Sequence, residues 1–415
     1  MSGEGFFNSR WVERPVHVTE DEHLPEGFRL GGAACGVMAK GSQELDLGIV
    51  VCDSEAAVSA ARFCDSGVLA APVVVTRERC DLGAIRAVVA NSGNANAATG
   101  EAGIAEAVRV QQAAADALGI SAREVAVAST GVIGVALPGQ RIASAIPALA
   151  ARLDGEGAGD FAQAIRTTDA IDKHVALRVA LPSGTVRLAA QAKGAGMISP
   201  HFATMLCFIE TDAVLTQPLA DALLGTAVAR SFDRISVDGQ LSTNDTAILL
   251  ASGASAIHVE AGSEDEKRFA RALEALLRQL ALRMVADGEG ARRIARVTVR
   301  GAGEETVERV GRSVANSPLV KAALFGGDPN WGRIAQAIGA ALPGTAPLSF
   351  EIAIEGIAVA RDGEAIGFER AALEEAVARN EVEYDVALPG EGAEAELFFS
   401  DLSYDYVKIN AEYTT

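Results

Sequence analysis

Cysteine is scarce and irregularly spaced in this chain of 415 residues. The five cysteines, Cys35, Cys52, Cys64, Cys80 and Cys207, are odd in number and form no C-x-x-C pair. Disulfide frameworks and zinc ribbons need paired, closely spaced cysteines, so both are excluded. The five histidines are scattered and add no metal-ligand spacing. We therefore expect reduced, mostly buried thiols in a cytoplasmic protein that has neither a metal site nor a cofactor.

Long apolar runs and a surplus of basic residues are also missing. No run approaches the roughly 20 apolar residues of a membrane span, so we expect no contact with membranes. The first 15 residues, MSGEGFFNSRWVERP, lack the basic and apolar regions of a signal peptide. The net charge of −19 disfavours nucleic acid as a partner, because nucleic acid is bound by basic surfaces.

The composition, with 49% hydrophobic and 22% charged residues, is that of a globular protein with one large or two medium domains. Short β-branched runs predict strands at 45–51, 69–76, 85–90, 124–128, 247–251, 294–300, 350–354, 383–387 and 394–399. Residues 175–181 and 185–191 predict a hairpin. Helices are predicted at 55–64, 101–118, 140–153, 217–231 and 263–285. Strands and helices do not alternate strictly, which favours an α+β fold.

One stretch, residues 193–212, reads KGAGMISPHFATMLCFIETD and joins a glycine turn to an apolar strand. Within it, Thr204 stands between a small residue, Ala203, and the apolar run 205–209. If the bond between Ala203 and Thr204 is cut, the free α-amine of Thr204 lies beside its own hydroxyl. An α-amine has a pKa of about 7.7–8.0 and accepts a proton near neutrality. Thr204 would then supply both a nucleophile and its base.

The same threonine has an ordinary structural interpretation. Threonine is favoured in strands because its branched side chain packs well on a pleated surface. A threonine at the head of a strand therefore needs no chemical role. The sequence around Thr204 leaves both interpretations open, and other motifs are needed to favour the catalytic one.

Three polar loops could complete a site. Residues 91–96, NSGNAN, read either as a binding loop or as a capping turn before the helix at 101–118. Residues 129–134, STGVIG, follow a strand and are able to aim amides and a hydroxyl at one oxyanion. Residues 242–246, STNDT, are a turn or part of a site. Glu289 lies between two glycines, which give its backbone unusual freedom.

Together these motifs make the chain resemble the ornithine acetyltransferase family, also called bifunctional glutamate N-acetyltransferases of arginine biosynthesis. The matching segments occur in the family's order over nearly the whole chain. They are 91–96 with 99–100, 129–134, 167–169, 193–197, 203–206, 238–239 with 242–246, 286–290, 326–334 and 407–411.

The resemblance implies a precursor that cuts itself between Ala203 and Thr204 into an α chain, 1–203, and a β chain, 204–415. It implies an αββα-like layered fold of the autoprocessing N-terminal-nucleophile type and an α2β2 assembly. The implied reaction is ping-pong: the threonine takes acetyl from N-acetylornithine and passes it to glutamate. The sequence leaves open whether acetyl-CoA is a second donor.

Residue roles also follow from the resemblance. Thr204 matches the nucleophile, and Thr130 with Gly131 matches the oxyanion-stabilising pair. Substrate-binding positions are matched by Thr167, Lys193, Thr204, Glu289, Asn410 and Thr415, with Thr168 as an alternative to Thr167. An amino-acid substrate needs a cation for its carboxylate and an anion for its ammonium, and Lys193 and Glu289 supply one of each.

Two other functions remain open at this point. An autoprocessing aminopeptidase or amidase of similar architecture would share the cleaved nucleophile but use water as the acceptor. An uncleaved binding protein would keep the fold without the reaction. The matches at 193–197 and 410–415 favour the acetyltransferase over the aminopeptidase or amidase. A denaturing gel distinguishes the binding protein, because an uncleaved chain gives one band near 42.8 kDa instead of two near half that mass.

Overall fold

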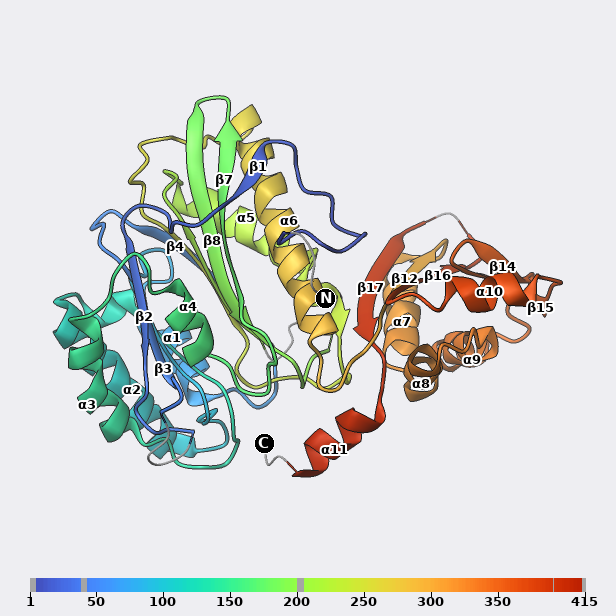
Figure 1. Ribbon diagram of the computed structural model, residues 1–415, viewed down its shortest axis with the longest axis horizontal. Helices are drawn as coiled ribbons and strands as arrows, with labels where there is room; N and C mark the ends of the chain where they lie inside the picture. The colour runs from blue at the N-terminus through green and yellow to red at the C-terminus, as the bar shows by residue number, and fades with distance from the viewer. Residues whose placement is uncertain (1–4, 39–42, 200–204, 391, 413–415) are drawn as a thin grey trace.

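The computed structural model describes residues 5–38, 43–199, 205–390 and 392–412. These residues form a large lobe and a smaller C-terminal lobe, joined by a narrower middle region (Figure 1). Two sheets make up the large lobe. The strands of the first, in spatial order, are β1 (Val18–Asp21), β7 (Lys173–Leu181), β8 (Gly184–Lys193), β9 (Leu206–Thr211), β11 (Thr246–Ala251) and β4 (Val58–Phe63). Those of the second are β2 (Phe28–Ala33), β3 (Leu47–Cys52), β5 (Ala87–Asn91) and β6 (Val125–Ser129).

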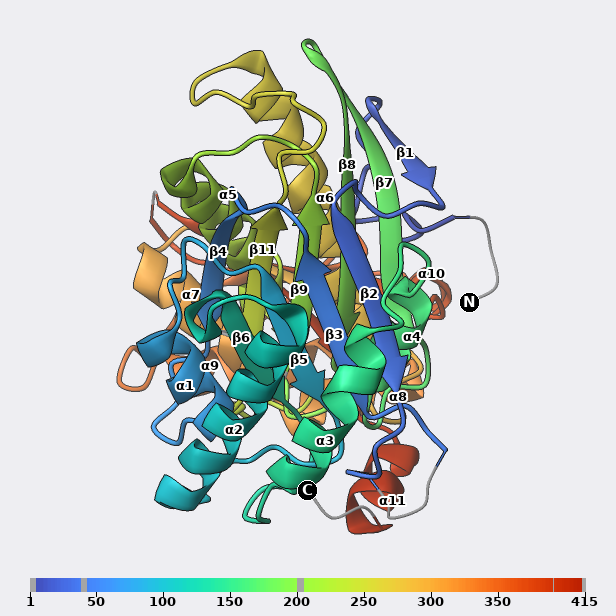
Figure 2. The same ribbon diagram turned by 90° about the vertical axis from the view of Figure 1, so that its left-hand side faces the viewer.

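The two sheets pack face to face and are covered by helices on both outer sides. Leu30 and Val50 from one sheet meet Phe208 and Ile248 from the other in a shared apolar core. The outer side of the four-stranded sheet is covered by α1 (Ala71–Arg79), α2 (Gly100–Leu118) and α3 (Gly139–Ala150) (Figure 2). The outer side of the six-stranded sheet is covered by α5 (Gln217–Ala229) and α6 (Glu264–Ala286). The short helix α4 (Ala158–Ala164) contributes Phe161 to the core between the sheets. The α+β class and the αββα layering predicted from the sequence are confirmed.

The smaller lobe was not predicted as a separate unit. Its seven-stranded sheet runs β10 (Ile235–Ser236), β17 (Glu394–Ser400), β12 (Ile294–Arg300), β16 (Glu381–Ala387), β13 (Glu351–Ile354), β14 (Ile357–Arg361) and β15 (Glu364–Ala365). Its helices are α7 (Glu304–Ala315), α8 (Pro318–Gly326), α9 (Trp331–Ala341) and α10 (Arg370–Ala376). The lobe has an apolar core of its own. A last helix, α11 (Tyr404–Glu412), leaves β17 and runs back beneath the large lobe (Figure 1).

Two local predictions were wrong. Residues 55–64, predicted as a helix from their alanines, contain the edge strand β4, which pairs antiparallel with β11. Residues 69–76, predicted as a strand from their valines, contain the start of α1. Pro72 in its first turn suits a helix start, because proline fixes the backbone in a helical φ and needs no N–H partner there. Within the described ranges, no helix is both long and apolar enough to cross a bilayer.

Candidate active site

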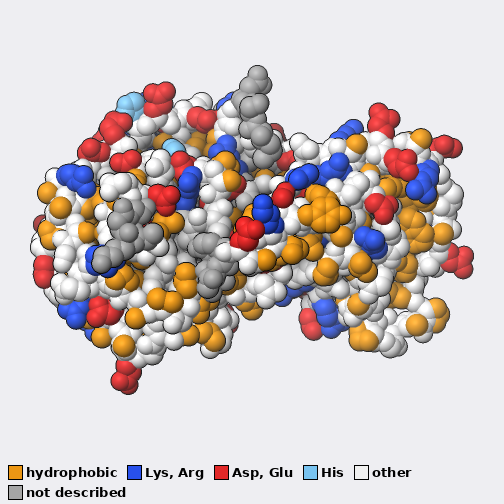
Figure 3. Space-filling model, turned by 60° about the horizontal axis from the view of Figure 1, so that its bottom comes forward, with side chains coloured by type: hydrophobic (Ala, Val, Ile, Leu, Met, Phe, Trp, Pro, Cys, Tyr) orange, Lys and Arg blue, Asp and Glu red, His pale blue; other side chains and the backbone are white. Residues whose placement is uncertain are grey.

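A pocket of about 240 Å³ opens where the ends of β6 and β8 meet α11. Six of the predicted site residues line it: Thr130, Gly131, Thr167, Lys193, Glu289 and Asn410. Thr168, the alternative to Thr167, lines it as well. Figure 3 views the molecule from the side of α11, where acidic and basic side chains lie among apolar ones. Residues as far apart in the sequence as Thr130 and Asn410 thus meet in a space of amino-acid size.

Three predicted residues, Ala203, Thr204 and Thr415, lie outside the described residues. Met205, the next residue after Thr204, is described and buried. Its N–H donates to the Asp245 carboxylate over 2.9 Å, and its carbonyl accepts from the N–H of Thr246 over 3.1 Å. The chain leading out of Thr204 is therefore anchored at the head of β9, between β8 and β11.

Lys193 is the cationic centre of the pocket. It ends β8, pairs with Leu206 across the sheet and is almost fully buried. Its ammonium donates to Thr167 Oγ1 over 2.8 Å and to Thr130 Oγ1 over 3.1 Å. An ammonium only donates, so both threonine hydroxyls keep their own protons for another acceptor. The third ammonium N–H makes no hydrogen bond within the described part of the chain and is available to a ligand.

Glu289 is the anionic wall. It follows α6, and its N–H donates to the Ala195 carbonyl over 2.8 Å, which ties it to the glycine turn. Asn410 of α11 donates to its carboxylate over 2.7 Å. A Cβ at Gly196 would lie 2.7 Å from the Glu289 carboxyl carbon, so glycine is needed to leave the carboxylate its place. The pocket is therefore lined by both a buried ammonium, that of Lys193, and a carboxylate, that of Glu289.

The loop 129–134 lies next to Lys193 and is shaped by the asparagine loop 91–96. Asn91 accepts from the Ser129 hydroxyl over 2.7 Å, and Asn94 bridges to both sides of Gly131. Gly131 has a φ of +132°, and a Cβ there would meet the Gly93 carbonyl carbon at 2.3 Å. Only glycine fits this position. The asparagine loop therefore supports the neighbouring loop 129–134. This role differs from both interpretations predicted from the sequence, a binding loop and a capping turn.

The polar segment 242–246 also braces the site. Asn244 donates to the carbonyls of Ala95 and Ser129 over 2.7 and 2.8 Å, which joins it to both neighbouring loops. Asp245, fully buried, holds the N–H of Met205. Burial raises the pKa of the Asp245 carboxyl well above its ordinary value, although the Met205 N–H and the charge of Lys193 oppose this. The segment is both a turn and a part of the pocket wall.

Asp238 and Tyr406 also line the pocket, although neither was predicted as a site residue from the sequence. Asp238 accepts from the amides of Met197 and Ile198 over 2.7 and 3.0 Å, and it fixes Met197 in the left-handed region at a φ of +56°. Tyr406 donates to the same carboxylate over 3.4 Å. The four-residue spacing of Tyr406 and Asn410 on one helical face was the available signal.

A second layer of charge lies directly behind Lys193. Asp169 Oδ2 is 3.9 Å from the Lys193 ammonium, and Asp169 Oδ1 accepts from Lys173 and from the Gly194 N–H, each over 2.7 Å. Lys173 is fully buried and also pairs with Asp287 over 2.6 Å. Burial raises the pKa of Asp169, but the charges of Lys193 and Lys173 outweigh it and hold the pKa well below its usual range.

The cysteines stand apart from this chemistry. All five are free thiols, and all but Cys35 are buried, so the prediction of reduced, mostly buried thiols is confirmed. Burial raises the pKa of each thiol, to about 11 for Cys52 and Cys80. Among the residues that the model describes, no three metal-ligating side chains gather at one point.

The fold and the pocket are those of a layered α+β enzyme. The model of the ArgJ family matches residues 29–415. A similar protein, arginine biosynthesis bifunctional protein ArgJ from Symbiobacterium thermophilum, is 42% identical over 393 residues, which cover 94% of this chain and 98% of that protein. The protein of the same name from Geobacter sulfurreducens is 42% identical over 395 residues, covering 94% and 99%.

The chain therefore belongs to the ArgJ family, a family of acyltransferases, and the family predicted from the sequence is confirmed. A solved structure of ornithine acetyltransferase from Mycobacterium tuberculosis, complexed with ornithine, is 38% identical to it. That match covers 42% of this chain and 92% of the other, with a TM-score of 0.39.

Proposed function

We propose that this chain is a glutamate N-acetyltransferase of arginine biosynthesis that carries acetyl from N-acetylornithine to glutamate on Thr204. The observation that carries the proposal is the pocket itself. A buried ammonium, Lys193, and a carboxylate, Glu289, line a space of about 240 Å³. Lys193 also pairs across the sheet with Leu206, two residues after Thr204. Both proposed substrates are small amino acids with a carboxylate at one end.

In this proposal the precursor first cuts itself between Ala203 and Thr204. The α chain, 1–203, and the β chain, 204–415, stay joined because the cut falls between β8 and β9, which remain paired over six residues. Residues after 204 also complete the large lobe, through β9, β11, α5 and α6. An α2β2 assembly of the two chains is part of the proposal.

The acetyl transfer then proceeds in two steps. The Thr204 hydroxyl attacks the acetyl carbonyl of N-acetylornithine, the C–N bond breaks, and the amine of ornithine leaves with the hydroxyl proton. The α-amine of glutamate next attacks the acetyl ester, the C–O bond breaks, and the proton returns to Thr204. The α-amine of Thr204 relays the proton in both steps.

The other residues have the following proposed roles. Thr130 and the Gly131 N–H stabilise the oxyanion, and the Thr130 hydroxyl is free to donate because Lys193 already donates to its oxygen. Thr167, Lys193, Glu289, Asn410 and Thr415 bind the amino acid. Lys193 has one ammonium N–H without a partner among the described residues, and this donor can bind a carboxylate.

Activity assays on the purified protein test this function. We expect ornithine to be released from N-acetylornithine only when glutamate is present, with N-acetylglutamate formed in equal amount. Ornithine release in water alone would instead identify an amidase, and no release would identify a binding protein. A parallel assay with acetyl-CoA and glutamate decides whether acetyl-CoA is a second donor.

A further inference from the structure

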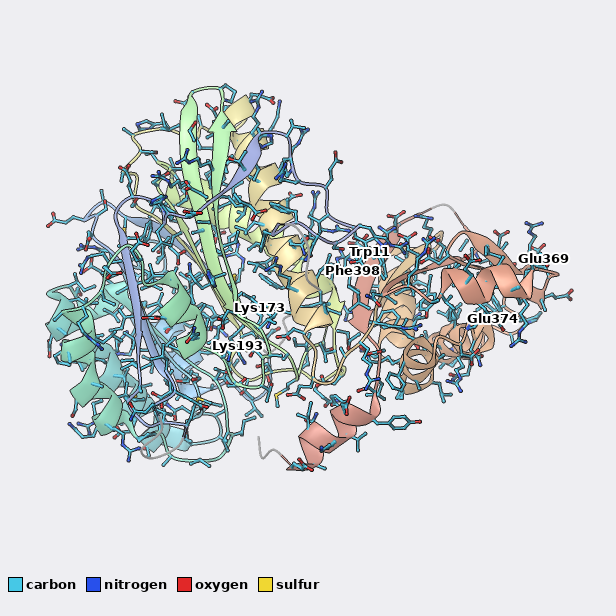
Figure 4. The ribbon with its side chains drawn as sticks, in the orientation of Figure 1. Trp11, Lys173, Lys193, Glu369, Glu374 and Phe398 are labelled. Atoms are coloured by element: carbon cyan, nitrogen blue, oxygen red, sulfur yellow. The ribbon has the colours of Figure 1, made fainter. Side chains whose placement is uncertain are left out.

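A line of four buried, charged side chains begins at the pocket wall and continues behind it: Lys193, Asp169, Lys173 and Asp287. Their signs alternate, and the successive distances are 3.9, 2.7 and 2.6 Å. The side chains of Lys173 and Asp169 are fully buried, and that of Asp287 is 6% exposed. Figure 4 shows Lys173 and Lys193 near each other at the lower end of the β7–β8 hairpin.

Stability alone does not explain a buried line of charges. Removing charges from water costs free energy, and a well-packed apolar cluster of similar volume is often at least as stable. Of the four residues, only Lys193 lines the pocket. Asp169, Lys173 and Asp287 stand behind the wall, where an effect on substrate can only pass through Lys193 or through the neighbouring turns.

We infer that Asp169 and Lys173 are positioning residues: Asp169 keeps Lys193 charged and aimed at the substrate carboxylate, and Lys173 couples it through Asp287 to the turn that bears Glu289. This inference rests on the proposed function, because it takes the amino-acid ligand of the pocket from it.

Asp169 faces Lys193 from the loop before β7 and is fixed from several sides. It accepts from Lys173, from the Gly194 N–H and, over 3.3 Å, from the Thr167 N–H. Burial lowers the pKa of Lys193, and the positive charge of Lys173 lowers it further. The carboxylates of Asp169, Asp245 and Glu289 oppose this decrease, with Asp169 contributing most. Asp169, held in place by these bonds, is thus the largest charge that opposes the decrease in the pKa of this buried lysine.

Lys173 connects the two walls of the pocket. Asp287 lies at the end of α6, two residues before Glu289, and its carboxylate also accepts from the N–H groups of Ala170 and Ile171 over 3.1 and 3.4 Å. The segment that carries Thr167 and Asp169 is therefore tied to the turn that carries Glu289. These contacts therefore set the distance between the Lys193 ammonium and the Glu289 carboxylate. That distance determines the length of the amino acid that fits the pocket.

The test compares Asp169→Asn with a matched control, Asp212→Asn, in the full-length protein. Asp212 is also a buried carboxylate that accepts a backbone N–H, at the opposite end of β9 from the pocket. For Asp169→Asn we expect KM for N-acetylornithine and for glutamate to rise about tenfold or more, with kcat changed much less. The alkaline limb of kcat/KM should move to lower pH by about one pH unit or more, because Lys193 then loses its proton earlier. Asp212→Asn should change neither quantity.

Asp287→Asn tests the proposed coupling of Lys173 to the turn that bears Glu289. It also keeps the inference testable if Asp169→Asn does not fold. Asparagine can still accept from Ala170 and Ile171 but no longer balances the charge of Lys173. We expect KM to rise for both substrates while the alkaline limb moves less than in Asp169→Asn. An Asp169→Asn or Asp287→Asn enzyme with lower thermal stability but unchanged KM and pH profile would overturn the inference. Absence of acetyl transfer in the unaltered protein would instead refute the proposed function.

Discussion

Lys193 is buried, yet it has hydrogen-bond partners that leave it a free donor. Two of its ammonium N–H groups go to threonine hydroxyls, and the nearest carboxylate, at 3.9 Å, is too far for a hydrogen bond. This is the arrangement expected of a group that binds a ligand anion, because one of its ammonium N–H donors stays unused.

Lys193→Met should impair both half-reactions by similar factors, since donor and acceptor share the α-carboxylate. We expect kcat/KM to fall on the order of 10²-fold or more for each, as is usual when a buried charge loses its partner. Assays of both half-reactions across roughly pH 6–9 provide the measurement. If only the pH profile moves while substrate affinity stays, Lys193 tunes the α-amine of Thr204 and does not hold the carboxylate.

Thr130→Ala should act on turnover, because its proposed partner is an oxyanion that forms only in the reaction. Loss of one such donor costs roughly 10²–10³-fold in kcat, and at least a tenfold decrease is expected here with little change in KM. Thr167→Ala is the matched comparison, since Thr167 also accepts from Lys193 but is proposed to bind substrate. It should raise KM instead. A change in KM alone for Thr130→Ala would contradict its proposed role.

Among the elements, α1 shows why local sequence misled. Val73 and Val75 are β-branched and would favour a strand, yet both are buried in a helix. Thr76 of the same helix donates to the Val127 carbonyl of β6 over 2.9 Å and accepts from the N–H of Val127 over 3.0 Å. Packing against β6 outweighs the small propensity difference, and that contact cannot be seen from the sequence of the helix itself.

Helix α11 is attached to the site by few contacts, and none of its side chains is fully buried. Asn410→Ala removes the hydrogen bond to Glu289, so KM should rise roughly tenfold, the usual effect of one bond to a charged group. The melting temperature should stay the same, because no core contact is lost. Lys408→Ala, an exposed neighbour on the same helix, is the control and should leave KM unchanged. Equal KM values for Asn410→Ala and Lys408→Ala would mean that Asn410 does not contribute to substrate binding.

Strand β9 carries a buried acid, Glu210, whose only described hydrogen-bond partner is Gln191 at 3.1 Å. Burial raises the pKa of Glu210 well above its ordinary value, with the Gln191 bond opposing it. The folded protein therefore keeps a proton that the unfolded chain loses above about pH 4.3. The free energy of unfolding then falls as pH rises from that value toward the raised pKa.

Glu210→Gln should remove this loss, because the amide stays neutral and offers a donor to the unpartnered oxygen of Gln191. We expect a melting temperature at pH 8 about 2 °C or more above that of the unaltered protein, and a smaller difference at pH 5. Calorimetry at both pH values measures this. A variant that is less stable at pH 8 would mean that Glu210 is charged and paired in the folded state.

At the level of the whole molecule, the family resemblance predicted the αββα layers and six residues that line the pocket, but the two lobes were not predicted. The predicted division after residue 203 marks the proposed cleavage site and does not coincide with the boundary between the two lobes. Strands β9 and β11 and helix α6 follow residue 203 but belong to the same lobe as the residues before it. Lys193, Glu289 and Asn410 were found through family motifs. Asp169 was quoted only as part of a motif, and Lys173 was not found, because their pairing depends on how β7 meets the end of α6.

Mass spectrometry after incubation with acetyl-labelled N-acetylornithine tests the central claim most directly. The account predicts two chains, the second starting at Thr204, with one labelled acetyl group on that threonine. It further predicts that added glutamate removes the label as N-acetylglutamate. The Thr204→Ala variant should remain one unlabelled chain, with the 42.8 kDa mass of the precursor less the small change from the substitution. An intact, unlabelled wild-type chain, or a label on any other residue, would contradict the account.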